Sequence, residues 1–135
     1  MFIQVEDSLS LAQVQEKFST RYPYLKLEFF RQPHSLHGGS RKEHMIANDT
    51  LIRNCRTKHQ AGSLEIHPTD TVAHVEQTFQ DAFGLYVQVF RKSGTIWIET
   101  TVTDDWTLEK QNEEAELFFK DITEKGGYDR DSILQ

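Results

Sequence analysis

Cysteine is almost absent from this chain: Cys55 is the only one among 135 residues. A single cysteine excludes an intramolecular disulfide and is typical of proteins kept in a reducing compartment. No stretch approaches the roughly 20 apolar residues that a membrane-spanning helix needs. The first residues, MFIQVEDSLS, hold neither an early basic residue nor a long apolar core. We therefore expect no signal peptide, no membrane contact and a cytoplasmic location.

Motifs of known chemistry are also lacking. The sequence has no nucleophile elbow, dinucleotide-binding glycine pattern, calcium loop or metalloprotease helix. Asp104 and Asp105 look like a carboxylate pair, but adjacent side chains point apart on a strand or a helix, so helix capping explains them better. We expect no cofactor and favour a non-catalytic protein, while an enzyme whose site is assembled from distant residues stays open.

The composition is that of a globular protein, with 37% hydrophobic residues and a mean hydropathy of -0.60. This length predicts one domain, which we place at residues 1–125, followed by a mobile tail at 126–135. The 21 acidic and 15 basic residues give a net charge of -6, which argues against a general nucleic-acid coat.

Residues 2–31 and 63–91 resemble each other, which indicates two copies of one unit. Each copy alternates apolar and polar residues, then places apolar residues at helical spacing, then alternates again. The helical parts align at an offset of 61 residues, and the offset falls to 60 after the turn. Two serial βαβ units predict an α+β fold, with a ferredoxin-like or split-βαβ sheet and both helices on one face.

The predicted helix boundaries have local causes. Ser10 followed by Gln13 is a capping box, and Thr71 can cap the second helix. Pro23 disfavours helical geometry at the residue before it, and Gly84 can adopt the left-handed conformation that ends a helix.

A β-hairpin strand at 95–99 and a C-terminal helix at about 105–124 are expected after the second copy. A turn at Ser93-Gly94 would set Phe90 opposite Trp97 and Val89 opposite Ile98. Tyr86, Phe90 and Trp97 would then form an aromatic cluster on the face away from the first two helices. We expect the C-terminal helix to cover this cluster; a partner, a second copy or a ligand is the alternative.

The charge is unevenly distributed. Residues 31–62 hold six basic and two acidic side chains, a balance of +4, whereas residues 99–135 hold four and eleven, a balance of -7. The connector at 32–62 between the two copies is therefore a basic island. Four of the six histidines also lie in it.

Several interpretations of the island compete. Gly38-Gly39-Ser40 with Arg41 and Lys42 could bind a phosphate-containing ligand, but the pattern lacks the rest of a phosphate-binding loop, so a solvated turn is favoured. Nucleic-acid binding is disfavoured because aromatic residues do not interleave with the charges. Pairing of the island with the acidic C-terminal segment is a further alternative.

The island offers only weak candidates for metal or thiol chemistry. His34, His37 and His44 are candidate zinc ligands, but they lack the paired spacings and the thiolates of a structural zinc site, so we predict no metal. Cys55 is expected to be a half-buried structural thiol, because nothing in the sequence brings a base to it. Residues 45–56 should form a short strand or a helical turn.

The segments YPYLKLEFFRQPH, FRKSG and DDWTLEKQNEE resemble a group of small uncharacterised bacterial cytoplasmic proteins. The resemblance runs through most of the chain, and the last two segments are its most specific parts. It implies a bacterial cytoplasmic origin and brings no activity, cofactor or catalytic residue.

The leading hypothesis is therefore a protein-interaction module. Its contact surface would be the aromatic face at Tyr86, Phe90 and Trp97, or the basic island at Arg41 and Lys42, and its partner another protein or a second copy. The alternative is a small enzyme, or a protein that binds a metal or a phosphate-containing ligand through the connector at 31–62.

Overall fold

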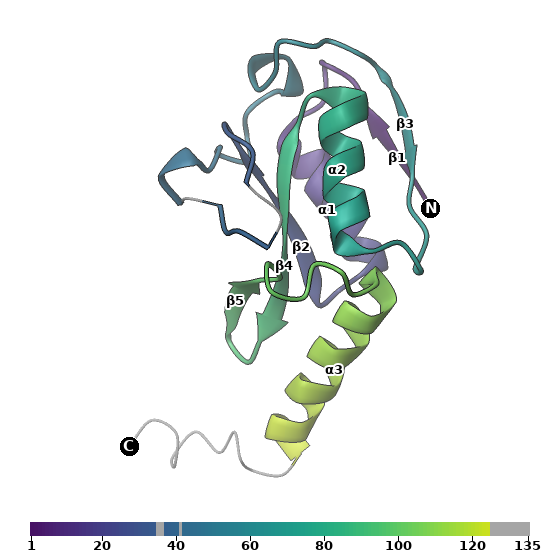
Figure 1. Cartoon of the computed structure of the whole chain (residues 1–135), viewed down its shortest axis with the longest axis vertical. Helices are drawn as coiled ribbons and strands as arrows, with labels where there is room; N and C mark the ends of the chain where they lie inside the picture. The colour runs from purple at the N-terminus through teal and green to yellow at the C-terminus, as the bar shows by residue number, and fades with distance from the viewer. Residues whose placement is uncertain (35–36, 41, 125–135) are drawn as a thin grey trace.

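The computed structural model describes residues 1–34, 37–40 and 42–124. Its three helices and two antiparallel sheets confirm the α+β class (Figure 1). The elements in chain order are β1 (Phe2–Val5), α1 (Leu11–Arg21), β2 (Leu25–Phe30), η1 (Lys42–His44), η2 (Ile52–Asn54), β3 (Gly62–Glu65), α2 (Val72–Phe83), β4 (Tyr86–Ser93), β5 (Ile96–Glu99) and α3 (Leu108–Glu124).

Strand pairing differs from the ferredoxin-like or split-βαβ expectation. β1 pairs antiparallel with β3 in a two-stranded ribbon, and β2, β4 and β5 form a separate antiparallel sheet in that order. Each strand of the first unit thus pairs with its counterpart in the second. Ile3 lies opposite Leu64 and Glu28 opposite Gln88, which are the positions that the offsets of 61 and 60 residues align. This pairing buries the apolar faces of both units in one core.

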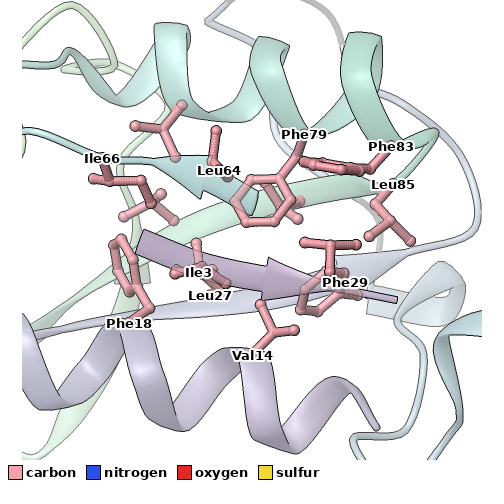
Figure 2. Packing of buried hydrophobic residues seen from close by; sticks show 14 of the residues in the cluster. Ile3, Val14, Phe18, Leu27, Phe29, Leu64, Ile66, Phe79, Phe83 and Leu85 are labelled. Carbon is pink, nitrogen blue, oxygen red and sulfur yellow. The ribbon is translucent and has the colours of Figure 1, made fainter. Parts of the chain in front are cut away.

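The core lies between the ribbon, the sheet and the first two helices. α1 packs along β2 and α2 along β4, so both helices cover the buried face of the sheet. Figure 2 shows Val14 and Phe18 of α1 and Phe79 of α2 pointing into the space where Ile3 and Leu64 lie. Phe79 also meets Phe29 edge-on, with ring centroids 6.1 Å apart.

The first and last residues of α1 and α2 are set by the local signals that the sequence predicted. Ser10 and Gln13 make the full capping box, and the Thr71 hydroxyl accepts the His74 N–H. α1 ends at Arg21, before the Tyr22-Pro23 pair, and Gly84 ends α2 with a φ of 65°.

The loops after β2 and after β5 complete the first turns of α1 and α2. Leu11 N–H donates to Thr50 O at 3.0 Å, and Val72 N–H donates to Trp106 O at 3.0 Å. These bonds satisfy backbone donors that a helix start leaves free. The segment at 45–56 therefore combines both predicted conformations: Met45 bridges Phe30 as an extended residue, and η2 is a helical turn.

The predicted register of the hairpin is wrong. Phe90 lies opposite Glu99, and Ile98 lies opposite Arg91 rather than Val89. The turn residues are Gly94-Thr95, because Gly94, with a φ of 65°, takes the first turn position that this geometry reserves for glycine. Phe90 and Trp97 still share a face, as diagonal rather than direct neighbours.

The third helix also departs from expectation. α3 begins at Leu108 rather than 105, and the Thr107 hydroxyl, not an aspartate, accepts the Lys110 N–H. It packs by Leu108 and Ala115 and then runs beyond the end of the sheet (Figure 1). Its Phe119 ring contacts Tyr24 rather than the predicted aromatic cluster. The predicted tail at 126–135 lies outside the described residues.

Candidate functional site

An open groove of about 430 Å³ lies on the face of the sheet opposite the core. We call it the aromatic groove. Antiparallel pairing sets Lys26, Phe90 and Glu99 side by side across β2, β4 and β5, and Trp97 follows two positions from Glu99 on the same face. Its full lining is Lys26, Glu28, Phe30, Ser40, Lys42, Met45, Phe90, Trp97 and Glu99.

Lys26 places a cation over the aromatic floor of this groove. Its Nζ lies 5.0 Å from the Trp97 ring centroid and 5.6 Å from that of Phe90, which is cation–π geometry. Trp97 keeps 36% of its surface exposed. Burial holds the pKa of the neighbouring Glu28 carboxyl above its usual value, and the Lys26 charge opposes part of that rise. The floor therefore presents exposed ring surface beside a lysine, and the carboxylates of Glu28 and Glu99 line the same groove.

The connector forms the other wall of the aromatic groove. Ile46 N–H donates to Phe29 O at 2.8 Å and Arg31 N–H donates to His44 O at 2.9 Å, which docks the segment beside β2. The adjoining η1 turn carries Lys42, and Ser40 Oγ donates to Gln88 Oε1 at 3.2 Å. Basic connector and aromatic sheet face thus meet in one site.

A second, smaller cavity of about 80 Å³ lies at the other end of β4, against α2. Two buried carboxylates line it, Glu76 at 7% and Asp104 at 1% exposure, together with His34 and Tyr86. Glu76 Oε2 accepts the Val89 N–H at 2.9 Å.

Burial raises the pKa of Glu76, and the negative charge of Asp104 raises it further. His34 acts in the opposite direction: its Nε2 lies 3.2 Å from Glu76 Oε1 and lowers the pKa of that carboxyl. A carboxyl with a raised pKa beside an imidazole is an arrangement that acid–base chemistry can use.

Three histidines of the connector contact carboxylates: His34, His37 and His59. His37 Nδ1 lies 2.8 Å from Asp104 Oδ1, and the His37 N–H donates to Asp104 Oδ2 at 3.1 Å. His37 has a φ of 59°, a left-handed conformation that is uncommon outside glycine. Across residues 1–34, 37–40 and 42–124, no three His, Cys, Asp or Glu side chains group as a metal site. His34 and His37 anchor the connector instead, and His44 lies apart from them in η1.

Cys55 is half-buried, as expected. Its Sγ donates to Leu51 O at 3.3 Å, and burial raises the pKa of the thiol. His59 pairs with Asp7 instead, with Nδ1 2.7 Å from Oδ2. A raised thiol pKa opposes a role for Cys55 as a nucleophile.

The structure brings three of the five predicted contact residues together. Phe90, Trp97 and Lys42 line the aromatic groove, whereas Tyr86 lines the small cavity. Arg41 lies outside the described residues. At the predicted glycine turn, a Cβ added to Gly39 would lie 2.5 Å from Glu99 Oε2. The Glu99 carboxylate therefore already occupies the space beside Gly39.

Sequence reasoning missed the contributions of Lys26, Phe30 and Met45 to the aromatic groove, and of Glu76 to the cavity. The alternation of β2 put Lys26 and Phe30 on the solvent face, but only the pairing of β2 with β4 places them beside Phe90. Glu76 occupies a helix position whose counterpart in the first unit, Gln15, hydrogen-bonds the strand β2. The match between Gln15 and Glu76 was the sequence signal that could have indicated a contact between Glu76 and a strand.

Comparison with known proteins adds nothing to this geometry: no protein-family model, curated protein or solved structure matches the chain. Among the described residues, no helix is long and apolar enough to cross a membrane.

Proposed function

We propose that this chain is a non-catalytic protein-interaction module whose contact surface is the aromatic groove. The observation that supports it most is the convergence of Phe90 and Trp97 with Lys26 and Lys42 in one open groove. Tryptophan and other large aromatic side chains dominate the binding energy of protein interfaces, and rim charges steer the partner.

The groove favours a partner segment that carries an apolar side chain next to an acidic one. The apolar group would rest on the Trp97 and Phe90 rings, and the carboxylate would approach Lys26 and Lys42. No ion pair joins either lysine to a carboxylate among the described residues, so both ammonium groups are available to an acidic partner.

Capture of partners from a lysate of the source cells, with quantification by mass spectrometry, tests this proposal. Trp97→Ala and Lys42→Glu should each reduce recovery of the same protein at least tenfold. Phe2→Ala is the matched control, because Phe2 is an exposed aromatic residue on β1, outside the aromatic groove. Equal recovery with all four chains would overturn the proposal, provided circular dichroism shows that each variant is folded.

An enzyme, or a protein that binds a metal or a phosphate-containing ligand through the connector, is the second candidate. The raised pKa of Glu76 beside His34 in a small cavity favours it. Metal analysis of the purified chain, with thermal shifts on adding zinc or nucleotides, separates the two candidates. A shift that His34→Ala abolishes would support this second candidate.

We propose further that residues 2–31 and 63–91 are copies of one unit and that the chain acts in the bacterial cytoplasm. Matching backbone bonds support the first point. Ile52 N–H donates to Leu9 O, and Leu108 N–H donates to Asp70 O; Leu9 and Asp70 are 61 residues apart. The segment resemblance supports the second point.

A further inference from the structure

The strand β5 has an outer edge whose backbone groups face away from β4. Ser93 and Ile96 flank the two-residue turn, and Thr100 N–H donates to Val89 O at 3.2 Å. Alternate residues of an antiparallel strand bond to the same neighbour, so Ile96 and Ile98 bond to β4. The N–H and C=O groups of Trp97 and Glu99 therefore point outward.

The edge of β5 carries no lysine, no proline and no bulge. Edge strands are commonly guarded by lysine, proline or a bulge. β5 has the sequence Ile-Trp-Ile-Glu, in which Ile96 is 60% and Trp97 36% exposed. In the described part of the chain, β5 ends the order β2-β4-β5, and it lies at the margin of the sheet in Figure 1. Apolar surface thus accompanies unpaired backbone groups.

We propose that a second copy of this chain pairs with β5, antiparallel, about a twofold axis at Ile98. In this register Trp97 lies opposite Glu99 of the second copy, and Ile98 lies opposite Ile98 of the second copy. The two β2-β4-β5 sheets then join into one. The proposal goes beyond the proposed function, since it uses the backbone edge of β5 and needs no other protein.

Charge complementarity selects both the occupant and the register. Lys26 Nζ lies 5.0 Å from the Trp97 ring centroid, so a carboxylate that arrives opposite Trp97 meets a cation. Glu99 of the second copy is that carboxylate, and the twofold axis repeats the contact. A shift that set Glu99 opposite Glu99 would place like charges together, which destabilises a ladder. The register that sets Trp97 opposite Glu99 is therefore self-complementary.

Pairing of four-residue strands makes a small interface, and small interfaces are weak and transient. We expect a dissociation constant between about 1 µM and 1 mM. Sedimentation velocity of the full chain across that range should show a monomer–dimer equilibrium. Glu99→Lys should weaken the dimer at least tenfold, because it sets two cations together. The control Glu65→Lys makes the same charge change at an exposed site on β3 and should leave dimerisation unchanged.

Disulfide trapping tests the register independently of affinity. In a Cys55→Ser background, Ile98→Cys should form a disulfide-linked dimer under mild oxidation, because Cα atoms of facing non-hydrogen-bonded residues lie about 4.5 Å apart. Ile96→Cys is the matched control. In the proposed register, residue 96 of one copy and residue 96 of the other are offset by four positions. They lie about 13 Å apart along the strand, which is too far for a disulfide.

Dimers that Glu99→Lys weakens and Ile98→Cys traps would support the proposal. A chain that stays monomeric at 1 mM, or one that is trapped equally through residue 96, would overturn it; the edge would then be left to a strand of another protein. Lys42→Glu keeps the two proposals distinguishable. It should reduce partner capture at the aromatic groove at least tenfold while leaving the dimer intact.

Discussion

Replacing Glu76 tests whether a buried carboxylate stabilises β4 by accepting the Val89 N–H. In the folded chain Glu76 Oε2 accepts the Val89 N–H at 2.9 Å, and the side chain of Gln88 at 3.3 Å. Glu76→Ala leaves the buried Val89 donor without that partner, which costs about 1–3 kcal/mol of the free energy of unfolding. For a domain of this size, about 4 °C of melting temperature corresponds to each kcal/mol, so the loss is roughly 4–12 °C.

Glu76→Gln separates the hydrogen bond from the charge. The amide oxygen can still accept the Val89 N–H, so this variant should lose little stability. Burial raises the pKa of Glu76 above its ordinary value of 4.5, so the folded chain holds this proton at pH values where the unfolded chain has lost it. The free energy of unfolding of the native chain therefore falls as pH rises from 4.5 through the raised pKa. Gln does not titrate, so the Gln variant does not lose this stability. The difference between its free energy of unfolding and that of the native chain should therefore shift in its favour from pH 4 to pH 7.

Urea denaturation at several pH values, followed by circular dichroism, measures both effects. Gln77→Ala is the control, since Gln77 is the next residue of α2 and is exposed. An Ala variant within about 0.5 kcal/mol of the native chain would refute the role of Glu76 at the β4 edge. A pH-independent difference between the Gln variant and the native chain would refute the claim that burial penalises the charged form.

Three further predictions concern local structure. Ser10→Ala removes the capping box of α1 and should cost about 1 kcal/mol in denaturant unfolding; an unchanged midpoint would contradict the cap. Gly84→Ala should cost about 1–2 kcal/mol, because its φ of 65° strains any residue with a Cβ and because that Cβ would lie 3.2 Å from Lys58 Cβ. The Cys55 thiol should react with a disulfide reagent more slowly than an unfolded control at pH 7, because burial raises its pKa; equal rates would show that the thiol is open.

The aromatic groove shows how far local pattern reaches. Alternation along β4 and β5 correctly put Phe90 and Trp97 on one face, because side-chain direction depends only on position in a strand. The turn was placed one residue early, and this shifted the predicted opposite residues. Lys26 and Lys42 joined the site only through the pairing of β2 with β4 and the docking of the connector beside β2. Those contacts join residues distant in the chain, and no local period encodes them.

The sequence by itself determined the main helices and strands and the ends of α1 and α2. Helical spacing, the Ser10 cap, Pro23 and Gly84 act within one or two turns of chain, so a local reading suffices. Only the tertiary structure decided which strands pair. Every strand offered the same alternating pattern, and β1 could have joined β2 as readily as β3. The choice followed from burying both units in one core, which is a property of the whole chain, and the same packing brought Lys42 and Trp97 into one groove.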